Sequence, residues 1–226
     1  GAAEGAVFLA EEQTGGRGRH GRVFYSPRGK GIWMSFLIKP NIPFLLAPQM
    51  TILLSVAMCR TVRKVCGLDA QIKWPNDVLI GKKKTCGILV ESIAEADTVT
   101  AMIAGIGVSV NLERNDFPPE LREKAISLME AAGGKRFSRE ALIAEFFNEF
   151  ESLYALYRSE GFAPIKSLWE ALTCTLGEKV AVSTPQGVVT GVALSITDEG
   201  ALRVREENGR HQTLYSGDLA ISEKTL

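Results

Sequence analysis

The chain carries the segment Gly15-Gly16-Arg17-Gly18-Arg19-His20-Gly21-Arg22-Val23-Phe24, in which three arginines lie among four glycines. Glycine lets backbone amides approach a ligand closely, and arginine supplies permanently charged donors that suit carboxylate and phosphate. Because the segment has few groups to pack, we expect a loop that stays mobile until an anion orders it. The alternative is a solvated basic turn.

Residues 16–21 of this segment also match the dinucleotide fingerprint G-x-G-x-x-G. That fingerprint needs a strand before it and a helix that opens at its last glycine. An apolar run at residues 7–10 predicts the strand, but Pro27, Gly29 and Gly31 follow and prevent the helix. The sequence therefore excludes a Rossmann turn. It also lacks a Walker A motif, because Gly81-Lys82 has no earlier glycine at the required spacing.

Strands and helices follow one another without regular βαβ alternation, which indicates an α+β fold. Ser138 and Gly161 are expected to cap the start and end of the second helix, whose aromatic stripe predicts core packing. A hairpin is expected around Gly81-Lys82-Lys83. Apolar patterns predict strands at residues 32–38, 71–74, 77–80, 86–91 and 99–106, and helices at residues 48–65 and 137–158.

The texture of the chain changes near Leu176. Short β-rich runs follow, separated by turns that contain glycine, at residues 179–182, 188–196, 201–205 and 212–215. This pattern predicts a small barrel. A module of this size is marginal alone, so we expect it to pack on the larger domain.

Composition limits the classes of function. The 226 residues balance 26 basic against 26 acidic side chains, so recognition of an anion must be local. The four cysteines form no C-x-x-C pair and only two histidines are present, which disfavours a structural zinc site and indicates reduced thiols in a cytoplasmic protein. We expect neither a signal peptide nor an apolar run of membrane-spanning length.

The pentapeptide Lys73-Trp74-Pro75-Asn76-Asp77 forms a second constellation. Lysine neutralises phosphate, tryptophan offers a stacking face, and the Asn-Asp pair after proline holds a tight turn. An aspartate beside phosphate also suits Mg²⁺. The alternative is a strand end with a turn and an incidental Lys–Asp pair.

The next strand carries a third group of polar and small residues. The hairpin is expected to bring Lys84 beside the Asn-Asp turn, with Gly87 allowing close backbone approach. Lys82 and Lys83 are expected in the exposed turn. Residues 105–111 add bare backbone and small polar side chains near a strand end.

Four motifs in this order resemble those of biotin protein ligases: residues 13–22, residues 73–77, Lys84-x-x-Gly87-Ile88-Leu89 and Gly105-x-Gly107. The resemblance spans essentially the whole chain. It implies a catalytic domain at residues 1–175, with a mixed sheet and helices of the class II synthetase type, and an SH3-like β-barrel at residues 176–226. It also implies an ATP-dependent ligase that activates biotin to biotinyl-5′-AMP. The acceptor would be a lysine of the biotin carboxyl carrier domain of a carboxylase.

The resemblance further implies roles for single residues, with biotin, ATP and Mg²⁺ as ligands. Lys84 would bridge the biotin carboxylate and the α-phosphate, Arg17 and Arg19 would share the catalysis, and Asp77 would hold Mg²⁺. Ser109 stands where the family usually has asparagine, and Phe24 stands where an aromatic stacks near adenine. The other implied contacts with biotin or nucleotide come from Gln13, Gly16, Gly18, Arg22, Lys73, Trp74, Asn76, Gly87, Ile88, Gly107 and Asn111.

Two alternatives accompany this hypothesis. A lipoate or octanoyl transferase of the related fold would lack Lys-Trp-Pro-Asn-Asp, and a biotin-responsive repressor would need a helix-turn-helix. No recognition helix or basic stripe is evident, so we expect this chain alone to bind neither DNA nor membrane. The resemblance implies a homodimer through a sheet edge. It also implies a Ser-Thr-Asn segment before residue 7, and we therefore expect an N-terminal part of the family fold to be missing from this chain.

Overall fold

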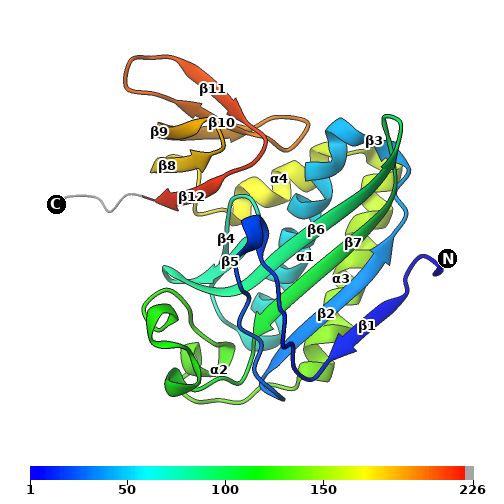
Figure 1. The fold of residues 1–226 in the computed structure, drawn as a ribbon, viewed down its shortest axis with the longest axis vertical. Coiled ribbons are helices and arrows are strands. Elements are labelled where there is room, and N and C mark those ends of the chain that lie inside the picture. Colours follow the sequence, from blue (N-terminus) through cyan, green and yellow to red (C-terminus); the bar gives the residue numbers. More distant parts are fainter. Residues whose placement is uncertain (222–226) are drawn as a thin grey trace.

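The computed structural model describes residues 1–221, which form two antiparallel sheets and one layer of helices (Figure 1). The larger sheet has seven strands in the order β1-β2-β7-β6-β5-β4, and the short β3 pairs with β7. Its strands are β1 (Val7–Ala10), β2 (Gly31–Ile38), β3 (Ile42–Pro43), β4 (Ala70–Lys73), β5 (Asp77–Ile80), β6 (Lys83–Glu95) and β7 (Thr98–Ser109).

The expected α+β class is confirmed. All the pairings between these strands are antiparallel. The parallel part of the expected mixed sheet is confined to isolated bridges, which join Ile72 to Thr173 and Lys84 to Ala125. Strands β6 and β7 are longer than the sequence predicts, because they continue together as a twisted hairpin beyond the buried part of the sheet.

Helices cover one face of the larger sheet and leave the other face open (Figure 1). Gly67 ends α1 in the left-handed conformation (φ 69°), as expected for a C-terminal glycine. The helices are α1 (Ala47–Cys66), α2 (Leu128–Ala131), α3 (Arg139–Glu160) and α4 (Ala163–Leu172), with 3₁₀ turns η1 (Arg19–Gly21), η2 (Phe44–Leu46), η3 (Arg114–Asp116) and η4 (Pro119–Leu121).

The central helix α1 corrects one expectation. By length and composition the helical span Phe44–Cys66 is long and apolar enough to cross a membrane. However, 67% of its most apolar window is buried inside the protein. Leu53, Leu54 and Val56 are fully buried, and α1 packs on α3, α4 and the sheet. The run therefore serves as a core helix, which has the same composition as a membrane span because both exclude water.

The second sheet has five strands in the order β11-β10-β9-β8-β12. Its strands are β8 (Lys179–Thr184), β9 (Gly187–Ile196), β10 (Leu202–Arg205), β11 (His211–Leu214) and β12 (Asp218–Ile221). The strand β12 was not expected from the sequence. Closure into an SH3-like barrel and a boundary after residue 175 stay predictions, and residues 222–226 of that expected domain lie outside the described residues.

The second sheet is joined to the helical layer by the turn between β9 and β10. Gln49 Nε2 donates to the carbonyl of Asp198 at 2.6 Å, and Tyr157 Oη donates to Gln49 Oε1 at 2.5 Å. A Cβ at Gly200 would lie 3.4 Å from the Gln49 amide nitrogen, so the turn fits closely against the start of α1. This confirms that the small module packs on the larger one.

Substitution of Ser138 tests the cap of α3. Ser138 Oγ accepts from the Ala141 amide at 3.1 Å, and the Ser138→Ala variant loses that bond. We expect its free energy of unfolding in urea to fall by about 1 kcal/mol. The matched control is Ser152→Ala on the exposed face of the same helix, where we expect a change within about 0.5 kcal/mol. Equal losses in both variants would contradict the assignment of the cap.

Candidate functional site

The floor of the site is a patch of bare backbone on the open face of the larger sheet. Strand β7 places Gly107 directly opposite Gly87 of β6, and β5 places Asp77 opposite Gly87. Residues directly opposite in an antiparallel pair share a face. The ring of Phe24 lies on this floor, because a Cβ at Gly107 would come within 2.3 Å of its Cε1 atom. The two glycines therefore provide a flat surface for a planar group.

A β-bulge directs Lys84 toward the same floor. The register between β5 and β6 shifts after Val78, so that Leu79 faces Lys84. Strict alternation from Gly87 would send residue 84 to the helix side, and the extra residue in the bulge reverses this. Lys84 Nζ consequently lies 2.6 Å from Asp77 Oδ1 and 5.8 Å from the centroid of the Phe24 ring. Its expected place beside the Asn-Asp turn is confirmed.

The arginine-rich segment folds into a narrow irregular hairpin over this floor. Isolated bridges join Gln13 to Ser26 and Arg17 to Val23. The Phe24 amide donates to the Gly16 carbonyl at 2.9 Å, and a Cβ at Gly16 would lie 2.4 Å from the Phe24 carbonyl oxygen. Gly16 is thus required for this close approach, and the structure gives the loop a defined path.

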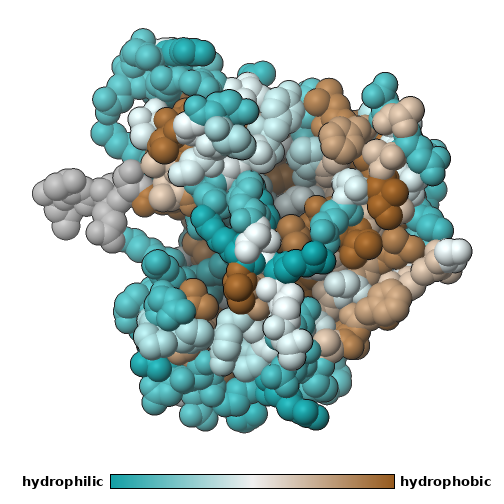
Figure 2. Space-filling model, in the orientation of Figure 1, coloured by the Kyte–Doolittle hydropathy of each residue, from teal (hydrophilic) through white to brown (hydrophobic). Residues whose placement is uncertain are grey.

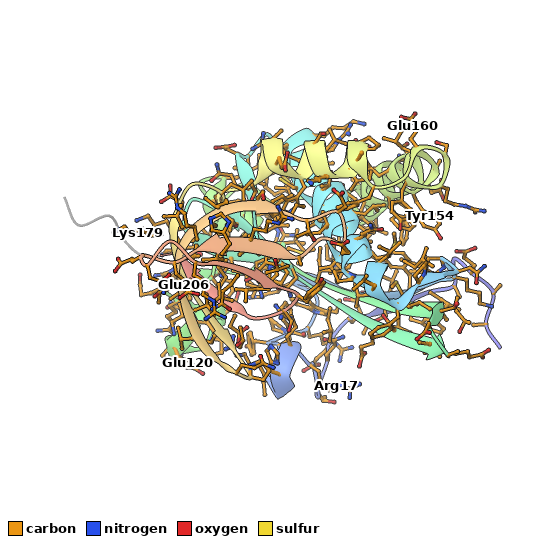
Figure 3. All side chains as sticks on the ribbon, turned by 90° about the horizontal axis from the view of Figure 1, so that it is seen from above. Arg17, Glu120, Tyr154, Glu160, Lys179 and Glu206 are labelled. Carbon is orange, nitrogen blue, oxygen red and sulfur yellow. The ribbon has the colours of Figure 1, made fainter. Side chains whose placement is uncertain are left out.

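The tip of the loop holds two guanidinium groups inward. Arg19 Nη1 donates to Asn76 Oδ1 at 3.2 Å and to the Gly217 carbonyl at 3.1 Å. Burial lowers the pKa of Arg19 from its ordinary value, and the neighbouring Asp218 and Asp77 act in the opposite direction. Arg22 Nη2 forms an ion pair of 2.6 Å with Asp218 Oδ2. Arg17, in contrast, extends outward from the loop, on the side of the sheet away from the helices that carry Tyr154 and Glu160 (Figure 3).

These parts enclose a cleft of about 1320 Å³. In Figure 2 the hydrophilic loop crosses the middle of this face, and apolar side chains gather beside it over the sheet. The expected site residues that line the cleft are Gln13, Gly16, Arg17, Gly18, Arg19, Arg22, Phe24, Lys73, Asn76, Asp77, Lys84, Gly87, Ile88, Gly107 and Ser109. The structure therefore brings together residues that lie far apart in the sequence.

Two expected site residues lie elsewhere. Trp74 is 1% exposed, and its indole N–H donates to the Gly200 carbonyl at 3.3 Å, so no face is available for stacking on a ligand. The Asn111 amide is buried and exchanges two hydrogen bonds with the backbone of Phe137, at 2.8 and 3.0 Å. Both residues are correctly placed near the motifs but hold the protein together instead of lining the cleft.

Ile88 and Asn76 line the cleft in a different way from that expected. The side chain of Ile88 is 1% exposed and belongs to the core, so Ile88 presents only its backbone. Asn76 Nδ2 donates to the Ile88 carbonyl at 2.7 Å, and the Ile88 amide donates to the Asn76 carbonyl at 3.0 Å. Asn76 thereby fixes the turn between β4 and β5 on β6 and leaves its Oδ1 atom for Arg19.

Sequence analysis missed two walls of the cleft. One wall is the segment with η3 and η4, from which Phe117, Leu121 and Lys124 face the cleft. The Lys84 amide donates to the Lys124 carbonyl at 2.9 Å, which ties this wall to β6. The other wall is β12, beginning with Asp218. Neither carries a recognisable motif, and only the tertiary contacts identify them.

The arrangement suits the reaction of two anions. Basic side chains outnumber acidic ones along the cleft, although the whole chain is neutral. Cations on a floor that admits planar or apolar groups, under a loop that limits access of water, can bring a carboxylate and a phosphate together. The fold and site thus define a protein that can activate a carboxylic acid with a nucleotide.

Comparison with known proteins agrees with this class. Residues 2–111 match the model of the Biotin/lipoate A/B protein ligase family, and residues 175–221 match that of the Biotin protein ligase C terminal domain. The chain is 44% identical to Bifunctional ligase/repressor BirA of Bacillus subtilis over 97% of this chain and 67% of that protein. The chain therefore belongs to the biotin protein ligase family.

Two further comparisons extend the likeness. The chain is 33% identical to the Biotin--[acetyl-CoA-carboxylase] ligase of Paracoccus denitrificans over 91% of this chain and 86% of the relative. Its fold superposes with a TM-score of 0.84 on the biotin protein ligase from Aquifex aeolicus in complex with biotin and ATP, at 27% identity, over 98% of this chain and 91% of that chain. The neighbour's cleft holds the two ligands that the motifs of this chain imply.

Substitution of Asn111 separates a structural role from a ligand contact. Asn111→Ala leaves the buried amide and carbonyl of Phe137 without partners. We expect the free energy of unfolding in urea to fall by about 2 kcal/mol or more. For Ser109→Ala, which changes a group on the cleft wall, we expect a loss below about 1 kcal/mol. An Asn111→Ala variant as stable as the unsubstituted protein would return Asn111 to the list of ligand contacts.

Proposed function

We propose that this protein is an ATP-dependent biotin protein ligase, which forms biotinyl-5′-AMP and then transfers the biotinyl group to a lysine of a carrier protein. The observation that carries the proposal is the position of Lys84, between the bare floor of Gly87 and Gly107 and the arginine loop. Membership of the family names the substrates that such a cleft takes.

In the first step, a carboxylate oxygen of biotin attacks the α-phosphorus of ATP. A mixed carboxylic–phosphoric anhydride forms, the bond from the α-phosphorus to the oxygen bridging to the β-phosphorus breaks, and pyrophosphate leaves with the electron pair. The two anionic reactants repel each other, so cations must lie between them. We assign this charge to Lys84, Arg17 and Arg19. Lys84 exchanges its contact with Asp77 for the substrate oxygens.

In the second step, the neutral amine of the acceptor lysine attacks the acyl carbon of the anhydride. An amide bond forms, AMP leaves, and the amine loses a proton to solvent. The anhydride reacts readily with water, so it must be shielded until the carrier arrives. We assign the shielding to the loop that carries Arg19, Arg22 and Phe24. Stacking of Phe24 on adenine stays a prediction.

Mg²⁺ is expected to accompany ATP, and the residues present fit it. Asp77 lies on the floor with its side chain 14% exposed, and Lys73 and Lys84 balance its charge. Within residues 1–221 no group of three or more His, Cys, Asp or Glu side chains could hold a metal alone. Mg²⁺ typically takes one or two carboxylates together with substrate phosphates, which Asp77 and ATP would provide. When bound, the ion would neutralise phosphate charge.

The partners follow from the same proposal. The acceptor would be a biotin carboxyl carrier domain of a carboxylase, as the name of the Paracoccus relative suggests. The edge strand β1 supports a homodimer through a sheet edge, since Phe8 is 66% exposed there. Some relatives are bifunctional repressors. That this chain alone binds no DNA or membrane, and that the protein is cytoplasmic, stay predictions.

Substitution of Lys84 tests the chemistry. We expect Lys84→Ala to lower biotin-dependent exchange of pyrophosphate into ATP by about 100- to 1000-fold, because a charge that stabilises the transition state is removed. The matched control is Lys83→Ala in the same hairpin. Lys83 pairs with Glu123 at 3.6 Å, outside the cleft lining, and its variant should keep nearly full activity. Exchange that persists in Lys84→Ala would remove Lys84 from the mechanism.

Calorimetric titration decides between the two acids that the family accepts. We expect heat of binding with biotin and none with lipoate at the same concentration, because Lys73-Trp74-Pro75-Asn76-Asp77 resembles the motif of the biotin enzymes. The protein unfolded in urea serves as the blank. Binding of lipoate but not biotin would replace the proposal by the lipoate alternative.

A further inference from the structure

The strand β12 belongs to the second sheet but forms a wall of the cleft. Within its own sheet it pairs with β8, with Asp218 opposite Ser183 and Ile221 opposite Val180. Asp218, Leu219, Ala220 and Ile221 also line the cleft. The second sheet therefore places one strand in direct reach of the arginine loop, which belongs to the larger sheet.

Two polar contacts join the loop to the start of β12. Arg22 pairs with Asp218 at 2.6 Å, and Arg19 donates to the carbonyl of Gly217 at 3.1 Å. The Asp218 side chain is 29% exposed, whereas that of Arg22 is 68% exposed, so the carboxylate is the more firmly embedded partner. The loop tip is thus tied to a strand that the loop's own sheet does not position.

The backbone that carries these partners is held closely. A Cβ at Gly217 would lie 2.4 Å from Cγ1 of Val182 in β8, so residue 217 packs directly on its neighbouring strand. The second sheet is itself anchored on the helical layer through Gln49 and on the Lys-Trp-Pro-Asn-Asp turn through Trp74. The start of β12 is therefore a fixed point for a loop that has few packing contacts of its own.

We propose that Asp218 is a positioning residue: by pairing with Arg22 it holds the arginine loop closed, and so retains the acyl-adenylate in the cleft until the carrier lysine arrives. The inference rests on the proposed function. Asp218 takes no part in bond formation or cleavage; it acts through Arg22 on the escape of the intermediate. The second sheet then contributes to catalysis by slowing the loss of a reactive product.

The test measures release of the intermediate apart from its formation. The full chain is loaded with labelled biotin and ATP, chased with excess unlabelled biotin, and sampled by rapid filtration for bound biotinyl-5′-AMP. We expect Asp218→Asn to release it about two- to fivefold faster, the scale set by a partly exposed ion pair. Pyrophosphate exchange, which reports formation, should change less than release, and Asp218→Glu should restore slow release.

A second ion pair between the two sheets' units offers a matched control. Lys166 of α4 pairs with Asp198 of the β9–β10 turn at 3.0 Å, and neither residue lines the cleft. Asp198→Asn should release the adenylate at the rate of the unsubstituted protein. Raised salt should speed release from the unsubstituted protein and have little effect on Asp218→Asn, since salt screens the pair that the variant lacks.

The outcomes distinguish this inference from the function on which it rests. If the unsubstituted protein forms no adenylate, the proposed function fails. If adenylate forms and Asp218→Asn releases it no faster, or if Asp198→Asn releases it equally fast, only the role of Asp218 is overturned. A parallel loss of formation and retention in Asp218→Asn, without rescue by Asp218→Glu, would also overturn it, because that pattern reflects general damage to the fold.

Discussion

The hydrogen-bonded register between β6 and β7 is the constraint on which the site depends. It sets Gly87 against Gly107, and the adjoining register of β5 sets Asp77 in the same row. A slip of one residue would turn all of these groups to the helix side, because side chains alternate along a strand. The long pairing of β6 with β7 and the apolar side chains buried beneath it make such a slip costly. The floor of the cleft therefore inherits the stability of the core.

Function at this floor depends on a local break in the same regularity. The bulge between β5 and β6 lets Lys84 share a face with Gly87, although an unbroken strand would separate them. A lysine on the helix side would lie in the core without water or partner. Its present position beside Asp77 costs little and leaves the charge available to a ligand. Core and site thus use one strand for opposite purposes.

The sequence predicted the main elements because their signals are local. The apolar spacing of α1, the Ser138 cap and the glycine stop at Gly67 each act within a few residues. The helix α4 was missed although Pro164 and the spacing of its apolar residues could have indicated it. The strand β12 is only four residues long and lacked any such signal. Trp74 and Asn111 were misassigned because a motif shows which residues are close to a site, not which way their side chains point.

The sequence by itself determined the fold class, the family and the chemical character of the cleft, because these depend on residue types and spacings within single segments. Only the tertiary structure decided which residues face one another. It turned Lys84 by a bulge, buried Trp74 against Gly200, and brought Asp218 to Arg22 across 196 positions of the chain. Such contacts depend on how whole layers pack, and packing is a property of all the surfaces at once. No single segment carries that information.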